Sequence, residues 1–543
     1  MTKAKKTQFV GIATLILAPA LVYYNGLRNG FVFDDRVLVV QNLRIRDWHN
    51  LFSHFSLYRP LRWFTYTAEY YLWGLNPLGY HLTNILLHVS CTLLLYLLAV
   101  RLFKGRFVPL VIALLFAVHP IGTEAVNGIA SRPDLLATVF LLSCLALYVR
   151  RTRSVWFYVL SVVSFGLALL SKEIVAIAIP VLLVGCDLCF DHGPKAMDVV
   201  RRNLRFYVPY GVVVALCVVA GWRRFAVSER VGDVSRYIEA GASSAQTSHT
   251  AILGTWGRAM CENLRLLVLP YNLCADYPFS HVSSIFDARV LLPLLVCLGF
   301  ILLVVKTYAH WREVSFGLFW ILVTLLPVSN IVPLTPHFVA ERYLYAPSIG
   351  FCVILGVLLD RAYHLPAGVF PQRFQRGLAV FCLLLIVTSY SVLTCRRNPD
   401  WKLDYALWSK TVRQRPRSAR AHANLGVAYH ERGLSQNAIG ELEKAIEISP
   451  GLAQAHCNLG VEYGTKGLND EAIRELTRAI EISPGLAAAH CELGAAYKER
   501  GLWQEALEEY ERATAIAPGL ALAHLASGRY TETWASTIRR SRS

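Results

Sequence analysis

Charged residues are scarce in this chain, and the motifs of several enzyme classes are missing. Only 17% of its 543 residues are Asp, Glu, Lys or Arg, against 55% hydrophobic residues and a mean hydropathy of +0.41. That balance is typical of a membrane protein. The sequence has no HExxH, no glycine-rich phosphate loop and no strand–turn–helix nucleotide motif. These absences argue against a zinc peptidase, a P-loop enzyme and a dinucleotide-dependent enzyme.

Glycosylation and metal signals are also lacking. No Asn-x-Ser/Thr acceptor is present, so nothing indicates a glycosylated lumenal surface. The 13 cysteines lie mostly inside apolar runs, where Cys behaves as a small hydrophobe. Cys186 and Cys189 form a CxxC without a second pair at metal spacing, so we expect them to pack at a helix end. The net charge of +17 comes largely from short loops between apolar runs, which favours membrane orientation over nucleic-acid binding.

Apolar runs long enough to cross a bilayer dominate the first 395 residues. The eleven candidate spans are Phe9–Tyr24, His81–Phe103, Phe107–Val118, Leu135–Val149, Val155–Leu170, Ile174–Cys189, Phe206–Trp222, Val290–Val305, Val314–Pro327, Tyr345–Leu359 and Leu378–Thr394. Lys3, Lys5 and Lys6 precede the first run, and no small-residue cleavage site follows it. We therefore expect an uncleaved anchor.

Loop charge predicts the orientation of these spans. With the N-terminus in the cytoplasm, every loop assigned inside is basic, including the one with Arg150, Arg151 and Arg153. The same alternation places outside the segments Asn25–Tyr80, His119–Asp134, Ser171–Glu173, Arg223–Arg289, Val328–Arg342 and everything after Cys395. The amphipathic stretch Leu253–Pro270 predicts an interfacial or re-entrant helix.

The C-terminal part repeats with a period of 34 residues. The motif Ala-His-x-Asn/Glu-Leu-Gly-x-x-Tyr begins at Ala421, Ala455 and Ala489, and a partial copy begins at Ala523. This resembles the tetratricopeptide repeat (TPR), in which paired helices stack into a solenoid with a concave peptide-binding face. We expect a membrane domain at 1–395, a linker with a first helix at 396–418 and TPR repeats at 419–535. The residues expected to dock a peptide are Asn424, Tyr429, Asn458, Tyr463 and Tyr497. The alternatives are that the array pads the membrane domain or mediates self-association.

Four groups of ionisable residues fall in loops assigned to the outer side. They are Asp34-Asp35, the block from His119 through Glu124 to Arg132 and Asp134, Lys172-Glu173, and Glu341-Arg342. Ionisable groups at membrane depth are costly and mark a functional site by default. Carboxylates are candidates for a general base or cation ligand, and Arg or Lys for binding a phosphate. The alternative is pairing within each group, such as Lys172 with Glu173 or Glu341 with Arg342.

A polar stripe runs along the second predicted span. His81, Asn84 and His88 are spaced i, i+3 and i+7 and share one helical face. Because a polar face is unfavourable in lipid, we expect it to turn into the bundle. His88 is expected to form hydrogen bonds there rather than to bind a metal.

Taken in order, these blocks are similar to those of the transmembrane and TPR-repeat-containing O-mannosyltransferases. The matching segments are Phe33-Asp34-Asp35, Tyr58-Arg59-Pro60-Leu61, Gly79 to His88, His119 to Asp134, Leu170 to Glu173 and Ala340 to Phe351, with TPR repeats following. The resemblance covers nearly the whole chain. It implies an all-α, GT-C-type membrane bundle followed by a TPR solenoid, with a polyprenyl-phosphate sugar as donor.

The resemblance also implies roles for individual residues. Asp34 and Asp35 would be the catalytic acids. The donor phosphate would be bound by Arg132, Lys172 and Arg342. The supporting residues would be Glu124, Asp134, Glu173, Glu341 and His88. We expect an inverting displacement in which Asp35 or Asp34 deprotonates a Ser/Thr hydroxyl and the polyprenyl phosphate leaves. A divalent cation, Mg or Mn, is a possible assistant of the carboxylate, and no metal ligand is assigned.

Cellular context and rival functions stay open at this point. The close similarity of the repeats and the missing glycosylation acceptors suit a bacterial inner-membrane protein with a periplasmic TPR array and an undecaprenyl donor. The counterpart in a eukaryote would be the ER membrane with a lumenal array. One rival function is a transferase acting on a lipid or surface glycan, and another is a membrane scaffold without enzymatic activity. A transporter is a weaker option, because no pathway of buried acids runs along several spans.

Overall fold

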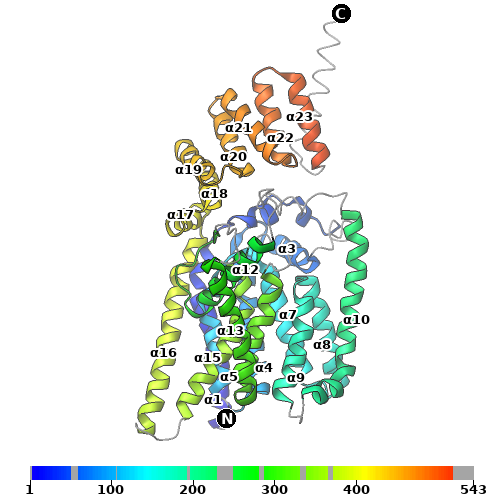
Figure 1. Ribbon diagram of the computed structural model, residues 1–543, viewed down its shortest axis with the longest axis vertical. Helices are drawn as coiled ribbons and strands as arrows, with labels where there is room; N and C mark the ends of the chain where they lie inside the picture. Colours follow the sequence, from blue (N-terminus) through cyan, green and yellow to red (C-terminus); the bar gives the residue numbers. More distant parts are fainter. Residues whose placement is uncertain are drawn as a thin grey trace, which may run out of the picture. The chain divides into compact units, whose positions relative to one another are not determined.

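The chain is all-helical over the residues that the computed structural model describes. These are residues 3–49, 59–105, 107–191, 196–228, 249–279, 287–329, 338–364 and 371–517. They divide into two compact units (Figure 1). The first contains Met1–Cys217, Ser248–Cys274 and Phe279–Ala406, and the second contains Val218–Thr247, Ala275–Pro278 and Leu407–Ser543. The first unit thus runs eleven residues beyond Cys395, into the segment predicted as a linker.

Each of the eleven predicted spans is a helix in the structure. Their bounds are α1 Lys3–Val22, α4 Pro77–Leu102, α5 Phe107–Val118, α7 Arg132–Tyr148, α8 Val155–Ser171, α9 Val175–Phe190, α10 Ala196–Ser228, α13 Ala288–His310, α14 Arg312–Leu325, α15 Pro347–His364 and α16 Gln372–Arg397. Among the described residues, six helices are long and apolar enough to cross a membrane alone, or seven with a bent pair counted as one. The chain is therefore a multi-pass membrane protein, and the count of eleven spans stays a prediction.

Helix ends in this unit carry ordinary capping chemistry. The Asn76 side chain accepts a hydrogen bond from the N–H of Leu78 at 3.1 Å, and Pro77 occupies the first position of α4. Ser154 accepts from the N–H of Trp156 at the start of α8, at 3.3 Å. Further helices include α3 (Pro60–Trp73), in the first outer segment, the short α6 (Thr123–Asn127), and α12 (His249–Val268), where the sequence predicted an amphipathic helix.

Small residues allow helices of the first unit to touch. A Cβ at Gly350 of α15 would lie 2.4 Å from the carbonyl oxygen of Gly317 in α14, so neither position has room for a side chain. The polar stripe on α4 turns inward as predicted: His81, Asn84 and His88 are all buried. Cys186 and Cys189 are buried thiols in α9, in agreement with a packing role.

The second unit contains three helix pairs in the described residues. They are α18 Ala419–His430 with α19 Ser435–Ile448, α20 Ala453–Thr465 with α21 Asn469–Ile482, and α22 Ala487–Glu499 with α23 Trp503–Ile516. A preceding helix, α17 (Asp404–Gln414), begins in the first unit and ends in the second. The partial fourth repeat predicted from Ala523 lies outside the described residues.

Repeat-specific contacts explain why the 34-residue motif folds this way. A Cβ at Gly426, Gly460 or Gly494 would come within 2.9 Å of a leucine or tyrosine of the facing helix, so only glycine permits this helix–helix distance. Each inter-helix turn also carries a glycine at positive φ, between 71° and 78°. The motif histidines tie each pair together. The Nδ1 atom of His456 lies 2.7 Å from a Glu475 carboxylate oxygen, and its Nε2 lies 3.1 Å from the Pro450 carbonyl.

Candidate active site

The two adjacent aspartates of the first outer segment have opposite environments. Asp35 is buried, with 1% of its surface exposed, and accepts hydrogen bonds from the N–H groups of Ala130 (2.6 Å) and Val32 (3.2 Å). Burial raises the pKa of Asp35 to about 7, against the lowering effect of these N–H donors. Asp34 is exposed. Asp35 therefore joins two backbone segments, while the neighbouring Asp34 is accessible to solvent.

The segment just after α16 holds the loop that carries these aspartates. The N–H of Phe33 donates to Asp404 Oδ1 at 2.7 Å, and Arg36 forms an ion pair with Asp404 at 2.9 Å. The N–H of Gly30 donates to the Lys402 carbonyl at 3.2 Å. Phe33 adopts a φ of 54°, which is unfavourable for a residue with a bulky side chain. Residues assigned to a linker by sequence thus fix the backbone next to Asp34.

Four asparagines extend this anchorage toward the membrane helices. Asn398 follows α16 directly, and its side chain donates to Asn25 Oδ1 at 2.7 Å and accepts from Asn127 Nδ2 at 2.8 Å. Asn29 donates to Asn127 Oδ1 at 3.2 Å and to the carbonyl of Asn398 at 3.0 Å. Buried amides that satisfy one another in this way fix relative positions of the segments that carry them. Three stretches that are far apart in the sequence, at residues 25–29, 127 and 398, therefore meet through these side chains.

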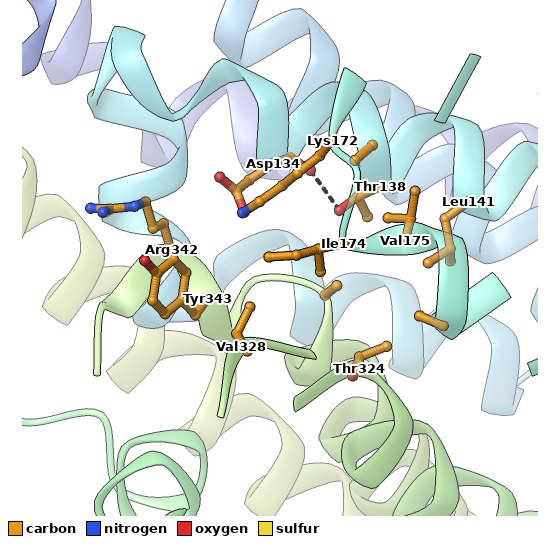
Figure 2. A pocket seen from close by; sticks show the side chains of 13 residues that line it. Asp134, Thr138, Leu141, Lys172, Ile174, Val175, Thr324, Val328, Arg342 and Tyr343 are labelled. Atoms are coloured by element: carbon orange, nitrogen blue, oxygen red, sulfur yellow. Dashed lines mark hydrogen bonds and ion pairs between the residues drawn. The ribbon is translucent and has the colours of Figure 1, made fainter. Parts of the chain in front are cut away.

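A pocket in the first unit has charged groups at one end and apolar groups at the other. Figure 2 shows Asp134, Lys172, Arg342 and Tyr343 together, with Leu141, Val175 and Thr324 farther along. Its lining is contributed by α7, α9, the loop between α8 and α9, the end of α14 and the turn before α15. The pocket therefore combines a polar head region with an apolar extension.

The two cations of the pocket pair with carboxylates from other elements. Lys172 Nζ lies 2.5 Å from Asp134 Oδ1. Arg342 forms an ion pair with Glu124, which also accepts from the Arg342 backbone N–H at 3.0 Å. All four residues belong to the candidate site that the sequence predicted. Each ion pair joins residues from two different groups of that site. The alternative pairs, Lys172 with Glu173 and Glu341 with Arg342, do not form.

Asp34 belongs electrostatically to the same pocket. Burial by itself lowers the pKa of Arg342, but the negative charges of Glu124, Asp34 and Asp134 outweigh it and raise that pKa. The charge of Asp34 thus acts on a cation that lines the pocket. An exposed carboxylate near a persistent cation is a suitable arrangement for taking a proton while an anion is stabilised beside it.

Arg132 is placed differently from the donor-binding role expected of it. Its side chain is fully buried, forms an ion pair with Glu69, and donates to Asn84 Oδ1 (2.9 Å) and to the Tyr80 carbonyl (3.0 Å). All three nitrogen atoms are thereby used between α3, α4 and α7. Arg132 does not line the pocket, because folding turns it toward these helices.

Glu341 and Glu173, like Glu124, also lie outside the pocket lining. Glu341 is fully buried and pairs with Arg397 of α16 at 3.2 Å. Glu173 receives two hydrogen bonds from Arg59, at 2.6 and 3.0 Å. Burial raises the pKa of Glu173, but the hydrogen bonds and charge of Arg59 prevail and lower it. Both acids therefore hold neighbouring segments in place.

His88 is a buried hydrogen-bonding residue. Its Nδ1 lies 2.7 Å from the Tyr345 hydroxyl and its Nε2 lies 3.1 Å from the Ala117 carbonyl. Across the described part of the chain, no three His, Cys, Asp or Glu side chains gather as a metal site. The expectation of Mg or Mn at this site stays a prediction.

The TPR residues expected to dock a peptide divide into two groups. Tyr463 packs against the hydrophobic clusters on both sides of its repeat, and Tyr497 does the same in the next repeat. A tyrosine at this position therefore fills part of the space between stacked helices, and its expected role in peptide docking stays a prediction. Asn424 and Asn458 are only partly buried and lie on the first helix of their pairs, and Tyr429 is also half-buried.

Sequence reasoning missed several residues of the site. Asn398, Asp404 and Arg397 lie after the last span, in a stretch read as a linker. Its sequence, Arg-Arg-Asn-Pro-Asp-Trp, has an acid and bases next to a membrane helix, which is the same signal that marked the other clusters. Arg59, which bonds to Glu173, lies in the segment Tyr58-Arg59-Pro60-Leu61, but the sequence assigned it no role.

The fold and this pocket show which class of protein the chain represents. The chain is a multi-pass membrane helical bundle with a charged pocket among its helix-connecting segments, followed by a TPR solenoid. Comparison with known proteins agrees: residues 60–222 match the family described as dolichyl-phosphate-mannose-protein mannosyltransferase. Three stretches, 406–453, 453–485 and 487–520, match tetratricopeptide repeats.

Three similar proteins with known names are protein O-mannosyl-transferases. A protein O-mannosyl-transferase of Caenorhabditis elegans is 29% identical over 82% of this chain and 64% of its own length. A Drosophila melanogaster protein O-mannosyl-transferase is 26% identical, with 82% and 56% covered, and a human one is 26% identical, with 78% and 49% covered. The chain is thus similar to protein O-mannosyl-transferases over most of its own length. It spans about half to two thirds of the length of these relatives.

Proposed function

We propose that this protein transfers mannose from a polyprenyl-phosphate carrier to Ser or Thr hydroxyls of exported proteins. The observation that carries the proposal is the two-part pocket. Lys172 and Arg342 stand at its charged end, and Leu141 and Val175 are among the residues of its apolar end. A phosphate fits the first and an isoprenoid chain fits the second. The names of the relatives supply the sugar and the protein acceptor.

In this proposal Asp34 is the general base. Asp35 already accepts two backbone N–H groups and is buried, whereas Asp34 is exposed and acts electrostatically on Arg342. Asp34 would remove the proton of the acceptor hydroxyl as its oxygen attacks the anomeric carbon. The bond from that carbon to the phosphate oxygen breaks, and the phosphate keeps the electron pair. A phosphate leaving group needs no strong general acid, so nearby cations suffice.

Arg342 and Lys172 are the proposed phosphate-binding residues. Both already have carboxylate partners, so a donor phosphate would share these cations with Glu124 and Asp134. The carboxylates hold the cations in position before the donor binds, which reduces the cost of ordering long side chains on binding. Arg132 acts at a distance, because its contacts fix the start of α7 and hence Asp134 two residues later.

The TPR array would present the acceptor polypeptide. Asn424 and Asn458 are the candidate contacts, since the motif tyrosines at 463 and 497 are taken up by packing. On the charge pattern of the loops, we infer that the site and the TPR array face the non-cytoplasmic side. A bacterial inner membrane with a periplasmic array is the proposed setting.

A transfer assay tests the proposal. The purified full chain would receive radiolabelled polyprenyl-phosphate-mannose and a set of Ser/Thr-rich peptides. Asp34→Asn should lower transfer at least about 100-fold, within the range for removal of a general base. Asp47→Asn is the matched control, because Asp47 is an exposed acid of the same segment whose side chain pairs with His49. Its transfer rate should stay at the wild-type level.

Four results would contradict the proposal in different ways. Undiminished transfer by Asp34→Asn would remove Asp34 from the mechanism. Transfer only with a different polyprenyl-phosphate sugar would show that mannose is the wrong donor. Transfer to no peptide but to a glycan or lipid acceptor would place the enzyme in another acceptor class, and inactivity with every donor would favour a scaffold.

A further inference from the structure

A groove lies between α4 and α7, near the ends of these helices that are remote from the pocket. It has a volume of about 190 Å³. Its lining is apolar along most of its length and ends at a guanidinium: Leu94, Leu97, Ser143, Ala146, Leu147 and Arg150. On α7 the donor pocket is lined by residues between Asp134 and Leu141 and the groove by residues between Ser143 and Leu147, so the two sites use successive stretches of one helix and share no lining residue. The groove is therefore distinct from the proposed donor pocket.

Arg150 lines this groove, and two more arginines lie at the same ends of α4 and α7. Arg101 closes α4, Arg150 and Arg153 follow α7, and the charges of Arg150 and Arg153 both act on Arg101. Throughout the described residues, none of the three has a carboxylate within ion-pair distance. Their neighbour Arg151 differs, since it pairs with Asp187 at 2.9 Å. Like charges held together repel one another, so this cluster is complementary to an anion.

We propose that the groove binds an anionic phospholipid of the cytoplasmic leaflet. The phosphate would contact Arg101, Arg150 and Arg153, and one acyl chain would lie along Leu97 and Ala146. Basic pockets between membrane helices on this side recognise anionic head groups. Guanidinium groups match a phosphate with paired hydrogen bonds. The apolar groove favours a lipid over free phosphate, because it gives the acyl chain a surface to cover. This inference stands independently of the proposed activity.

Basic residues in these loops would orient the protein in the membrane even if the groove bound no lipid. The test must therefore separate lipid binding in the groove from this general effect of positive charge. The full chain, purified in detergent, would be titrated with phosphatidylglycerol and followed by native mass spectrometry. The variant Arg101→Ala/Arg150→Ala removes two of the three cations. The matched control Arg201→Ala/Arg205→Ala removes two exposed cations of α10, which the charge pattern assigns to the same side. A second variant, Ala146→Leu, narrows the groove and keeps every charge.

We expect one tightly bound phosphatidylglycerol in the wild type. Arg101→Ala/Arg150→Ala should weaken its binding about 30-fold, as two interfacial cations of ordinary strength would. Ala146→Leu should also weaken binding, while the control stays at the wild-type affinity. Phosphatidylcholine and soluble glycerol phosphate should fail to displace the bound lipid.

Several results would overturn the inference. Equal weakening in the Arg201→Ala/Arg205→Ala control would show general attraction to basic residues. Unchanged binding in both groove variants would place the lipid elsewhere, including the donor pocket. Full displacement by glycerol phosphate would identify a simple phosphate site, and normal binding in Ala146→Leu would remove the acyl chain from the groove. Circular dichroism spectra of the variants, compared with wild type, would confirm that each one is folded.

Discussion

Asp404 should control catalysis although it lies after the last membrane helix. It accepts the Phe33 N–H at 2.7 Å and pairs with Arg36, and Phe33 keeps a φ of 54° beside Asp34. A left-handed conformation costs a residue with a side chain about 1–2 kcal/mol. A hydrogen bond to a charged acceptor contributes about 1.5–3 kcal/mol. The two terms are of similar size, so Asp404→Ala should allow Phe33 to relax and the Asp34 carboxylate to move.

The expected result is a loss of transfer with little loss of overall stability. A displacement of about 1 Å at the reacting groups can lower the rate about 100-fold. The ion pair with Arg36 is partly exposed and worth at most about 1 kcal/mol, so the thermal unfolding midpoint should change little. Lys402→Ala is the control, because its side chain is exposed while its carbonyl still accepts from Gly30. Transfer and unfolding would be measured on the same purified samples.

A second substitution separates a positioning role from a catalytic one. Glycine adopts positive φ freely, so Phe33→Gly in the Asp404→Ala background should restore part of the lost transfer. If Asp404 were itself the base, Phe33→Gly would restore nothing. Wild-type transfer by Asp404→Ala alone would refute the reasoning, because the strained turn would then be held by other contacts.

Three further predictions concern stability. Because burial raises the pKa of Asp35 from 3.8 to about 7, the folded state holds that proton more tightly than the unfolded chain. Its contribution to stability is therefore complete below about pH 4 and is lost as pH rises toward 7. Asp35→Asn should flatten this slope in thermal unfolding series, and an unchanged slope would assign it to other groups. His456→Ala removes the ring contacts with Glu475 and the Pro450 carbonyl and should lower the free energy of unfolding by about 2 kcal/mol. Amide exchange should become faster in α20 and α21 but not in α7. Gly460→Ala should lower the free energy of unfolding by about 1–3 kcal/mol, because the new Cβ would lie 2.6 Å from a leucine side-chain atom. In Gly440→Ala the new Cβ would meet nothing within 4 Å, so this control should stabilise the protein slightly. Equal effects of the two glycine substitutions on the unfolding midpoint would contradict this packing.

Local patterns in the sequence were sufficient for the architecture. Apolar runs located eleven of the helices that begin in the first unit, and the 34-residue period located the three helix pairs of the second. The inward turn of His81, Asn84 and His88 followed from their spacing alone. Hydrophobicity and helical periodicity are properties of neighbouring residues, so a single chain reports them directly.

Tertiary structure decided which charges meet. Lys172 pairs with Asp134, 38 residues away, and Arg342 with Glu124, 218 residues away, although each cation has a carboxylate next to it in sequence. Arg132, marked by the same local pattern, is turned into the helix packing. The difference between Asp34 and Asp35 arises in the same way, because the N–H of Ala130, from a distant turn, donates to Asp35, which is buried, whereas Asp34 is exposed. Sequence spacing determines which residues share a helix face, but the packing of helices determines which of those faces come together.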